Sequence, residues 1–309
     1  MNRTNFSNAR LQNSMPPWSA LARYASGLSV SERFSLFMYD TGRGTTDKSS
    51  APIILIHGLG DEADSWRHLI PLLADRHRVV APDLPGFGRS VVKKKATLAC
   101  HVAAITAILE QIGPAILVGS SMGAAVAELT AFRMPEKVPG LVLLDGGLPS
   151  AGKLNAGMLA SLVPGIGERG YRAYRQDHEA AYRSLVPYYA DLARLPEEDR
   201  AFLRERVIAR VESETQLRAY FSSFRSFIRT AIFTGPACRR KFTSFPGSVF
   251  IGWGEKDSVM PKATALLLSA TRRDAKYVTF AGAGHLPHQE TPEVVAAELE
   301  TFFLSCKIS

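Results

Sequence analysis

The chain is poor in cysteine: its 309 residues include only Cys100, Cys238 and Cys306. These three are too few for a disulfide framework and too scattered for a zinc site, and no CxxC motif occurs. No apolar run approaches the roughly 20 residues of a membrane span. Internal repeats and low-complexity tracts are also absent from the sequence. We therefore expect a cytoplasmic protein without a membrane span or a structural metal.

The N-terminus lacks the uninterrupted apolar core of a secretory signal. Its three arginines precede the first acidic residue, Glu32, a pattern that organelle presequences share. A transit peptide therefore stays open as an alternative to a flexible tail that leads into a short helix from Pro17. We favour the tail and assign residues 1–30 to an N-terminal extension.

Basic residues outnumber acidic ones by 37 to 29, so the formal net charge is +8. A basic balance is typical of nucleic-acid binding when the charges cluster. Here the arginines are dispersed, and the densest run, residues 93–95, holds only three lysines. We expect that run to be a solvated loop. The predicted partner is a small-molecule substrate rather than nucleic acid, and the chain is expected to be a monomer or a homodimer.

Short apolar runs alternate with helical patterns along most of the chain. Residues 52–57 form a run that is too short for a helix and is stopped by Gly58. Further runs of this kind occupy residues 77–83, 115–120, 141–145, 248–254 and 276–280. This alternation predicts the α/β class, with a mostly parallel, doubly wound sheet and helices on both of its faces.

The pattern changes over residues 149–240, which carry many arginine and aromatic residues at helical spacings and no convincing strand. We interpret this block as a helical lid inserted between two strands. Ligands bind at the carboxyl edge of such sheets, and the lid is expected to cover that edge. The core then consists of residues 31–148 and 241–309.

The segment 119–123, with the sequence GSSMG, follows one predicted strand and opens a helix. A G-x-S-x-G motif in that context indicates a nucleophile elbow, in which the central serine has a strained backbone. Flanking glycines let the strand and the helix pass closely. Ser121 is therefore the candidate nucleophile. Ser120 is expected to face elsewhere and to form a local hydrogen bond.

A serine hydroxyl needs a base, and the base needs an acid to orient it. His285 lies in a glycine-rich loop after the last predicted strand, and we prefer it to His288, which begins the next helix. Asp257 follows the strand at 248–254 and gives the chain order Ser, Asp, His. The alternative acid is Asp145, at the end of an earlier strand.

The oxyanion of an acyl-transfer intermediate needs fixed donors. Gly58 and Gly60 let the backbone turn after the strand at 52–57. The backbone N–H groups of Leu59 and Met122 are then expected to point at one oxygen. A plain turn is the alternative interpretation of these glycines. This set of groups requires no metal and no organic cofactor.

Five motifs together resemble the lid-bearing α/β-hydrolase superfamily over about residues 51–305: HGLGDEADSW, APDLPGFGRS, GSSMGAA, GEKDSVMP and GHLPHQETPE. In that superfamily they form the oxyanion loop, the strand-4 loop, the elbow, the acid turn and the histidine loop. The resemblance implies a Ser-His-Asp hydrolase with a helical lid. Ser120 stands where relatives often have His, and Ala124 where they often have Gly. The serine nucleophile separates the chain from haloalkane dehalogenases and soluble epoxide hydrolases, which use an aspartate.

The leading functional hypothesis is hydrolysis of an ester, thioester or lactone through an acyl-enzyme. Relatives also cleave the C–C bond of diketo acids, or amides, with the same groups. Four lid arginines could bind the carboxylate of such an acid: Arg172, Arg175, Arg225 and Arg229. A non-catalytic ligand-binding protein on the same scaffold is the third hypothesis.

The lid is expected to set specificity. Small and apolar residues mix over 154–167, and aromatic residues recur at near-helical spacing over 219–228. These features predict an apolar cavity that accepts a small to medium acyl group. The substrate-binding residues that we predict are Gly58, Trp66, Tyr220 and Phe224.

Overall fold

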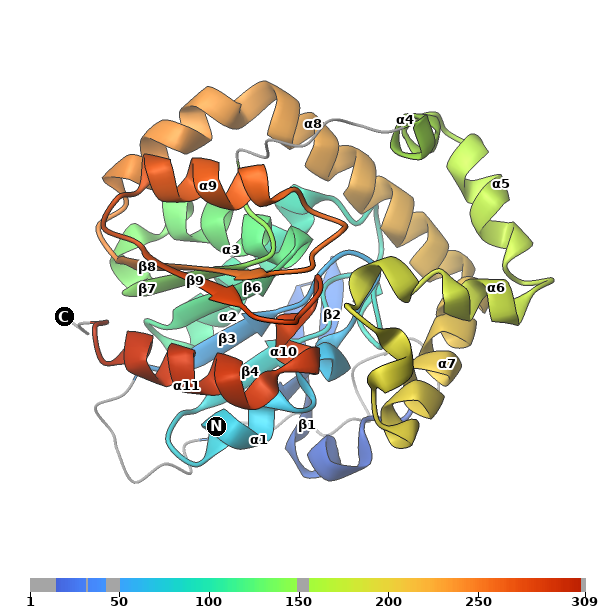
Figure 1. Cartoon of the computed structure of the whole chain (residues 1–309), viewed down its shortest axis with the longest axis horizontal. Helices are drawn as coiled ribbons and strands as arrows, with labels where there is room; N and C mark the ends of the chain where they lie inside the picture. The colour runs from blue at the N-terminus through green and yellow to red at the C-terminus, as the bar shows by residue number, and fades with distance from the viewer. Residues whose placement is uncertain (1–14, 32, 43–50, 149–155, 307–309) are drawn as a thin grey trace.

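The computed structural model describes residues 15–31, 33–42, 51–148 and 156–306. A twisted sheet crosses the middle of the molecule, and helices cover both of its faces (Figure 1). The strand order is β1-β2-β4-β3-β6-β7-β8-β9, with β5 beside β2. The strands are β1 Ala25–Ser31, β2 Phe34–Asp40, β3 Ile53–Ile56, β4 Val79–Pro82, β5 Val91–Val92, β6 Ile116–Ser120, β7 Gly140–Leu144, β8 Ser248–Gly254 and β9 Lys276–Phe280.

The helices of the core flank this sheet. They are α1 Leu69–Ala74, α2 Leu98–Ile112, α3 Met122–Arg133, α9 Lys262–Thr271, α10 Pro287–Glu290 and α11 Pro292–Phe303. Short 3-10 turns are η1 Ser19–Tyr24, η2 Ala63–Trp66, η3 Pro135–Lys137, η4 Val186–Tyr188 and η5 Leu192–Arg194. No described helix is both long enough and apolar enough to cross the lipid core of a membrane.

A second group of helices lies between β7 and β8 in the chain. It consists of α4 Ala156–Leu162, α5 Ile166–Ala173, α6 His178–Arg183, α7 Glu197–Glu212 and α8 Glu214–Ser244. Figure 1 shows α4 to α7 gathered at one end of the sheet, while α8 arches back along α3 and α9. The predicted start of the lid, residues 149–155, lies outside the described residues. The last lid helix, α8, ends at Ser244 rather than at the predicted boundary of 240.

The central strands β3, β6 and β7 are buried at every position. Strands that are covered on both faces need apolar side chains throughout, which explains the continuous apolar runs. One apolar cluster packs α2, α3, α8 and α9 on one face, and a second packs α1 and α11 on the other. The parallel register pairs Ile56 with Gly119, and Leu144 with both Ser120 and Gly252, so the loops after these strands emerge at one edge.

These observations confirm the predicted α/β class and the parallel core of the sheet. Strand β1 corrects the predicted boundary of the N-terminal extension. It occupies residues 25–31, whereas the sequence analysis assigns residues 1–30 to the extension. It pairs antiparallel with β2 at the sheet edge, and its described side chains are half-buried or exposed. An edge strand of this kind needs no continuous apolar run, and its ASGLSVS sequence therefore gave no signal.

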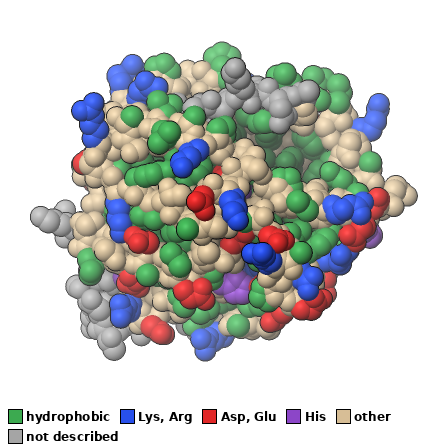
Figure 2. Space-filling view, viewed as in Figure 1, with side chains coloured by type: hydrophobic (Ala, Val, Ile, Leu, Met, Phe, Trp, Pro, Cys, Tyr) green, Lys and Arg blue, Asp and Glu red, His purple; other side chains and the backbone are tan. Residues whose placement is uncertain are grey.

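Two further predictions concern local structure. The single helix expected from the sequence after β3 is instead η2 followed by the short helix α1. The lysine run at 93–95 is exposed, as expected for a solvated loop. Basic and acidic side chains are interspersed on the face drawn in Figure 2 rather than gathered into one basic patch.

Helix α3 lies directly against the sheet at its first turn. A Cβ on Gly123 would overlap the carbonyl oxygens of Ile56 and His57, and a Cβ on Gly119 would overlap the backbone of Gly123. The strand-to-helix turn can therefore be this tight only with glycine at both positions. The contact also places the N-terminus of α3 beside the end of β3.

We predict that Gly123→Ala lowers the free energy of unfolding by about 3 kcal/mol or more, because the rigid backbone of β3 cannot move away from the new methyl group. Gly170→Ala is the matched control. Gly170 is exposed on helix α5, and a methyl group added there would meet no atom within 4 Å, so alanine should be neutral or slightly stabilising. Urea denaturation of both variants measures the difference, and equal stabilities would contradict the prediction.

Candidate active site

The backbone of Ser121 has the strained conformation that the elbow motif predicts. Its φ is +56° and its ψ is −121°, and Asp145 is the other described non-glycine residue with a positive φ. The Ser121 N–H donates to the carbonyl of Leu144 at 2.8 Å, which fixes the turn. The side chain makes no cap hydrogen bond to α3 and instead lines a cavity. The hydroxyl is therefore presented at the N-terminus of a helix, which favours developing negative charge.

His285 lines the same cavity as Ser121. Its Nδ1 lies 2.9 Å from Oδ2 of Asp257, and both side chains are buried. The other carboxylate oxygen accepts the N–H groups of Val259 and Met260 at 2.8 and 3.0 Å. A carboxylate held in this way accepts the Nδ1 proton and leaves Nε2 with a free lone pair. Nε2 of His285 is buried and has no hydrogen-bond partner among the described residues.

The acid loop and the histidine loop touch through their backbones. A Cβ on Gly254 would overlap the carbonyl oxygen of Gly284, and a Cβ on Gly284 would overlap the backbone of Tyr189 and Ala190. The N–H of His285 donates to the carbonyl of Tyr188 at 2.9 Å. The lid chain thus holds the histidine loop from the side opposite β8.

The loop after β3 lies against the nucleophile. A Cβ on Gly58 would lie 3.2 Å from Cβ and 3.7 Å from Oγ of Ser121. His57 braces this loop, since its Nε2 accepts the Leu84 N–H at 2.9 Å and its Nδ1 donates to the Gly58 carbonyl at 2.8 Å. Burial lowers the pKa of His57. The neutral ring therefore has a structural role, and Leu59, the predicted oxyanion donor, lies on the cavity wall.

Asp145, the alternative acid, lies behind Asp257 and not against the histidine. Its Oδ1 accepts the N–H of Gly254 at 2.7 Å, and its side chain is fully buried. One side-chain ligand atom from each of Asp145, Asp257 and His285 lies within 4.8 Å of the others. Burial, and next the charge of Asp257, hold the pKa of Asp145 well above its ordinary value. Both effects favour the protonated form of Asp145.

Two of the predicted substrate-binding residues are outside the cavity, which corrects the sequence-based assignment. Trp66 is fully buried and stacks on His288 with ring centroids 4.1 Å apart. The Nε2 of that histidine lies 2.9 Å from Oγ of Ser65, and burial lowers its pKa to about 3. Phe224 is buried on α8, about 6 Å further along the helix than Tyr220, and does not reach the lining. Tyr220 itself lines the cavity, as does Gly58.

Ser120 also departs from expectation, since its buried hydroxyl has no hydrogen-bond partner among the described residues. The four lid arginines that the sequence offered as carboxylate ligands do not line the cavity either. Arg172 and Arg175 bind Glu214, Arg225 binds Glu168, and Arg229 is exposed. Surface ion pairs within the lid therefore account for most of this charge.

The cavity has a volume of about 290 Å³ and lies between the core loops and the lid helices. Its wall is more polar than the sequence indicated. Five tyrosines line it: Tyr171, Tyr174, Tyr188, Tyr189 and Tyr220. Arg210 of α7 lines it as well, next to Asp61. The sequence analysis missed this arginine, because its partner lies 149 residues away in the chain.

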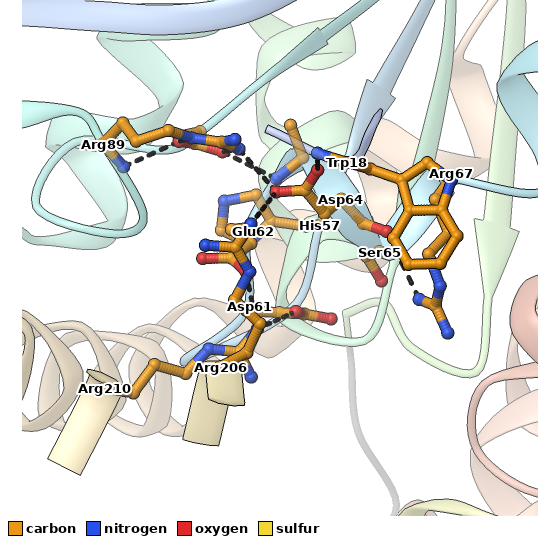
Figure 3. Close-up of polar contacts among 12 residues, drawn as sticks. Trp18, His57, Asp61, Glu62, Asp64, Ser65, Arg67, Arg89, Arg206 and Arg210 are labelled. Carbon is orange, nitrogen blue, oxygen red and sulfur yellow. Dashed lines mark hydrogen bonds and ion pairs between the residues drawn. The ribbon is translucent and has the colours of Figure 1, made fainter. Parts of the chain in front are cut away.

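A buried ion cluster joins α7 to the segment after β3 (Figure 3). Nη2 of Arg210 lies 2.7 Å from Oδ1 of Asp61, and Nε of Arg206 lies 3.2 Å from Oε1 of Glu62. Asp64 extends the cluster beyond Glu62, and Figure 3 shows the ion pair that it forms with Arg89. These charges are compensated pairwise, which a buried site requires. The cluster fixes α7 relative to the oxyanion loop.

Residues 53–298 match the family model described as the alpha/beta hydrolase family. A 2-hydroxymuconate semialdehyde hydrolase of Pseudomonas sp. (strain CF600) is 28% identical over 257 residues, covering 80% of this chain and 83% of that protein. A pimeloyl-[acyl-carrier protein] methyl ester esterase of Sodalis glossinidius is 27% identical over 259 residues, covering 84% and 93%. The structure of a 2-hydroxy-6-oxo-6-phenylhexa-2,4-dienoate hydrolase from Rhodococcus sp. strain RHA1 has a TM-score of 0.73 at 22% identity, over 90% of this chain and 98% of that chain.

The raised pKa of Asp145 predicts how one substitution changes stability with pH. A carboxyl whose folded pKa exceeds its unfolded value of 3.8 contributes stability below that pH, and this contribution is lost as the pH rises toward the folded pKa. An asparagine side chain has no such proton to lose and can still accept the Gly254 N–H. We therefore expect Asp145→Asn to raise Tm by a few degrees at pH 7–8 and to leave it nearly unchanged at pH 4. Thermal denaturation across this range tests the prediction, and a pH-independent effect would contradict it.

Removal of Arg206 takes one cation from both Glu62 and Asp64 and leaves each buried carboxylate with one cationic partner, Arg210 or Arg89. We expect Arg206→Met to lower the free energy of unfolding by about 3–5 kcal/mol. Arg204→Met is the matched control on the same helix, because the Arg204–Glu179 pair is solvent-exposed, and it should cost less than about 1 kcal/mol. Chemical denaturation compares the two, and an Arg206→Met variant as stable as the control would remove the argument for a buried cluster.

Proposed function

The chain belongs to the alpha/beta hydrolase family, and from that premise we propose that it is a serine hydrolase that cleaves an ester, thioester or lactone through an acyl-enzyme. One observation carries the proposal. Nε2 of His285 has no hydrogen-bond partner among the described residues, and His285 lines the same cavity as Ser121, while its Nδ1 is bound to Asp257. This is the arrangement that a general base needs in order to take the serine proton.

The proposed reaction has two halves. His285 removes the proton of Ser121 as Oγ attacks the carbonyl carbon, and the oxyanion accepts hydrogen bonds from the N–H groups of Leu59 and Met122. The histidine then protonates the leaving oxygen or sulfur, which departs and leaves the acyl group on Ser121. A water molecule, deprotonated by the same histidine, attacks the ester and releases the acid. Asp257 stabilises the imidazolium in both halves and keeps its own charge.

The cavity favours an ester over a diketo acid as substrate. Cleavage of a diketo acid needs a cation for its carboxylate, and Arg210 is the lining residue that carries one. Nη2 of Arg210 is already paired with Asp61 at 2.7 Å and lies 3.4 Å from Glu62. Its charge is therefore compensated by the protein. A complete triad likewise favours catalysis over a ligand-binding role.

A fluorophosphonate probe tests the proposal without knowledge of the substrate. We expect covalent labelling of the wild type at Ser121, identified by mass spectrometry, and none in Ser121→Ala. The matched control is Ser120→Ala, which removes a neighbouring hydroxyl that has no partner among the described residues and should label at the wild-type rate. Labelling that persists in Ser121→Ala, or maps to another residue, would overturn the proposal.

The orienting acid can be tested with the same probe. We expect Asp257→Asn to slow labelling by about 10³- to 10⁴-fold at pH 7, since an amide no longer stabilises the protonated imidazole. Asp145→Asn should label within about threefold of the wild type, because the histidine nitrogen Nδ1 is bound to Asp257 instead. If the two variants exchanged their effects, Asp145 would be the acid of the triad.

A further inference from the structure

Four tyrosine hydroxyls on the cavity wall have no hydrogen-bond partner among the described residues. They belong to Tyr171 on α5, Tyr174 at its end, Tyr188 in η4 and Tyr220 on α8. The fifth tyrosine, Tyr189, differs because its hydroxyl donates to Oε1 of Gln289 at 2.9 Å. None of the four oxygens is among the described polar atoms that are fully enclosed without a partner. Because all four residues line the cavity, their unused hydrogen-bonding capacity is available to a ligand bound there.

Three of these phenols, those of Tyr171, Tyr188 and Tyr220, are held in the neutral form. Burial raises the pKa of Tyr171 to about 12, and burial also raises the pKa values of Tyr188 and Tyr220. A neutral phenol donates to a carbonyl or ether oxygen and can also accept from a hydroxyl. The lining cation, Arg210, is paired with Asp61. The wall consequently offers hydrogen bonds without a net charge, which suits an uncharged group that bears oxygen atoms.

Aromatic rings make up a large part of the wall, and they favour a planar group. The rings of Tyr171 and Tyr220 lie 5.6 Å apart at an interplanar angle of 38°, and Tyr220 also covers Gly60 of the oxyanion loop. Tyr188 contacts the ring of His285, with centroids 5.7 Å apart. Aromatic faces of this kind stack on flat conjugated rings. The rest of the wall includes the apolar residues Leu59, Leu185, Leu203, Val207 and Leu286. Its polar side chains Ser184 and Gln289 already donate to the Ala181 carbonyl and to Ser65, so the wall would leave most hydroxyls of a sugar without partners.

We propose that the cavity binds an aromatic ring with hydroxyl, methoxy or carbonyl substituents, so that the substrate is an ester of an oxygenated aromatic compound. This inference rests on the proposed function and adds the substrate class to it. A straight aliphatic chain could fill the same volume. It would exclude solvent from the tyrosine hydroxyls but would offer them no hydrogen-bond partner in return. An unpaired polar group of that kind disfavours binding by about tenfold for each hydroxyl.

Competition against the fluorophosphonate probe measures this preference at Ser121 whether or not the competing ester is turned over. Three methyl esters serve as competitors: methyl 3,4-dihydroxybenzoate, methyl benzoate and methyl octanoate. The corresponding acetates of catechol, phenol and octanol test the opposite half of the ester. We expect the hydroxylated ring to protect at a concentration at least tenfold lower than either the plain ring or the chain, in one of the two series.

Single Tyr→Phe variants then test the assignment of the hydroxyls. Tyr171→Phe, Tyr174→Phe, Tyr188→Phe and Tyr220→Phe keep the rings, and at least one should lower the preference for the hydroxylated over the plain ring by about tenfold. Tyr182→Phe is the matched control, because Tyr182 is half-buried in the lid but does not line the cavity, and it should keep the wild-type preference.

The outcomes separate the two proposals. If the probe does not label Ser121, the proposed function fails and the substrate class falls with it. If Ser121 is labelled but octanoate or octyl acetate protects best, the inference about the aromatic substrate is overturned and the serine hydrolase stands. A preference for the hydroxylated ring that all four Tyr→Phe variants retain would show that other groups bind its oxygens, and the tyrosine assignment would be wrong.

Discussion

The geometry around Ser121 depends on helix α3, which lies against the sheet more closely than any side chain would allow. Glycines at 119 and 123 remove the two methyl groups that would separate helix and strand. The chain must then turn within one residue, and this forces the positive φ of Ser121. The same closeness puts Gly58 within van der Waals distance of the serine. The strain at one residue is thus maintained by backbone packing on both sides.

Positions around the histidine follow the same physical rule. The loops after β8 and β9 approach so closely that a side chain at Gly254 would overlap the other loop. Asp257 and His285 are therefore held by backbone contacts before their side chains meet. The buried proton on Asp145 belongs to this arrangement too, because two charged carboxylates cannot share one dry site.

The sequence was sufficient to predict the parallel core of the sheet, because apolar runs and glycine spacing are local signals. The same signals singled out Ser121 and His285 as candidates, and both line one cavity. The strand at 25–31 gave no such signal, since half of its surface meets water. Phe224 and Trp66 were misplaced because the sequence shows that a residue is aromatic but not which way the lid or loop turns it. The sequence gave no sign of the pairing of Arg210 with Asp61 either. It depends on tertiary packing between segments 149 residues apart.

The buried ion cluster attaches one segment of the lid to the core. Helix α7 is fastened to the core through Arg206 and Arg210, whereas three of the cavity tyrosines come from residues 171–188, which precede it. Helix α7 also contributes Leu203, Val207 and Arg210 to the cavity wall, and the earlier stretch also holds the histidine loop through the Tyr188 carbonyl. The contacts that attach the lid and the side chains that surround a ligand therefore belong to the same segments. A change of specificity in this lid must preserve the backbone contact to His285 and the ion pairs of α7.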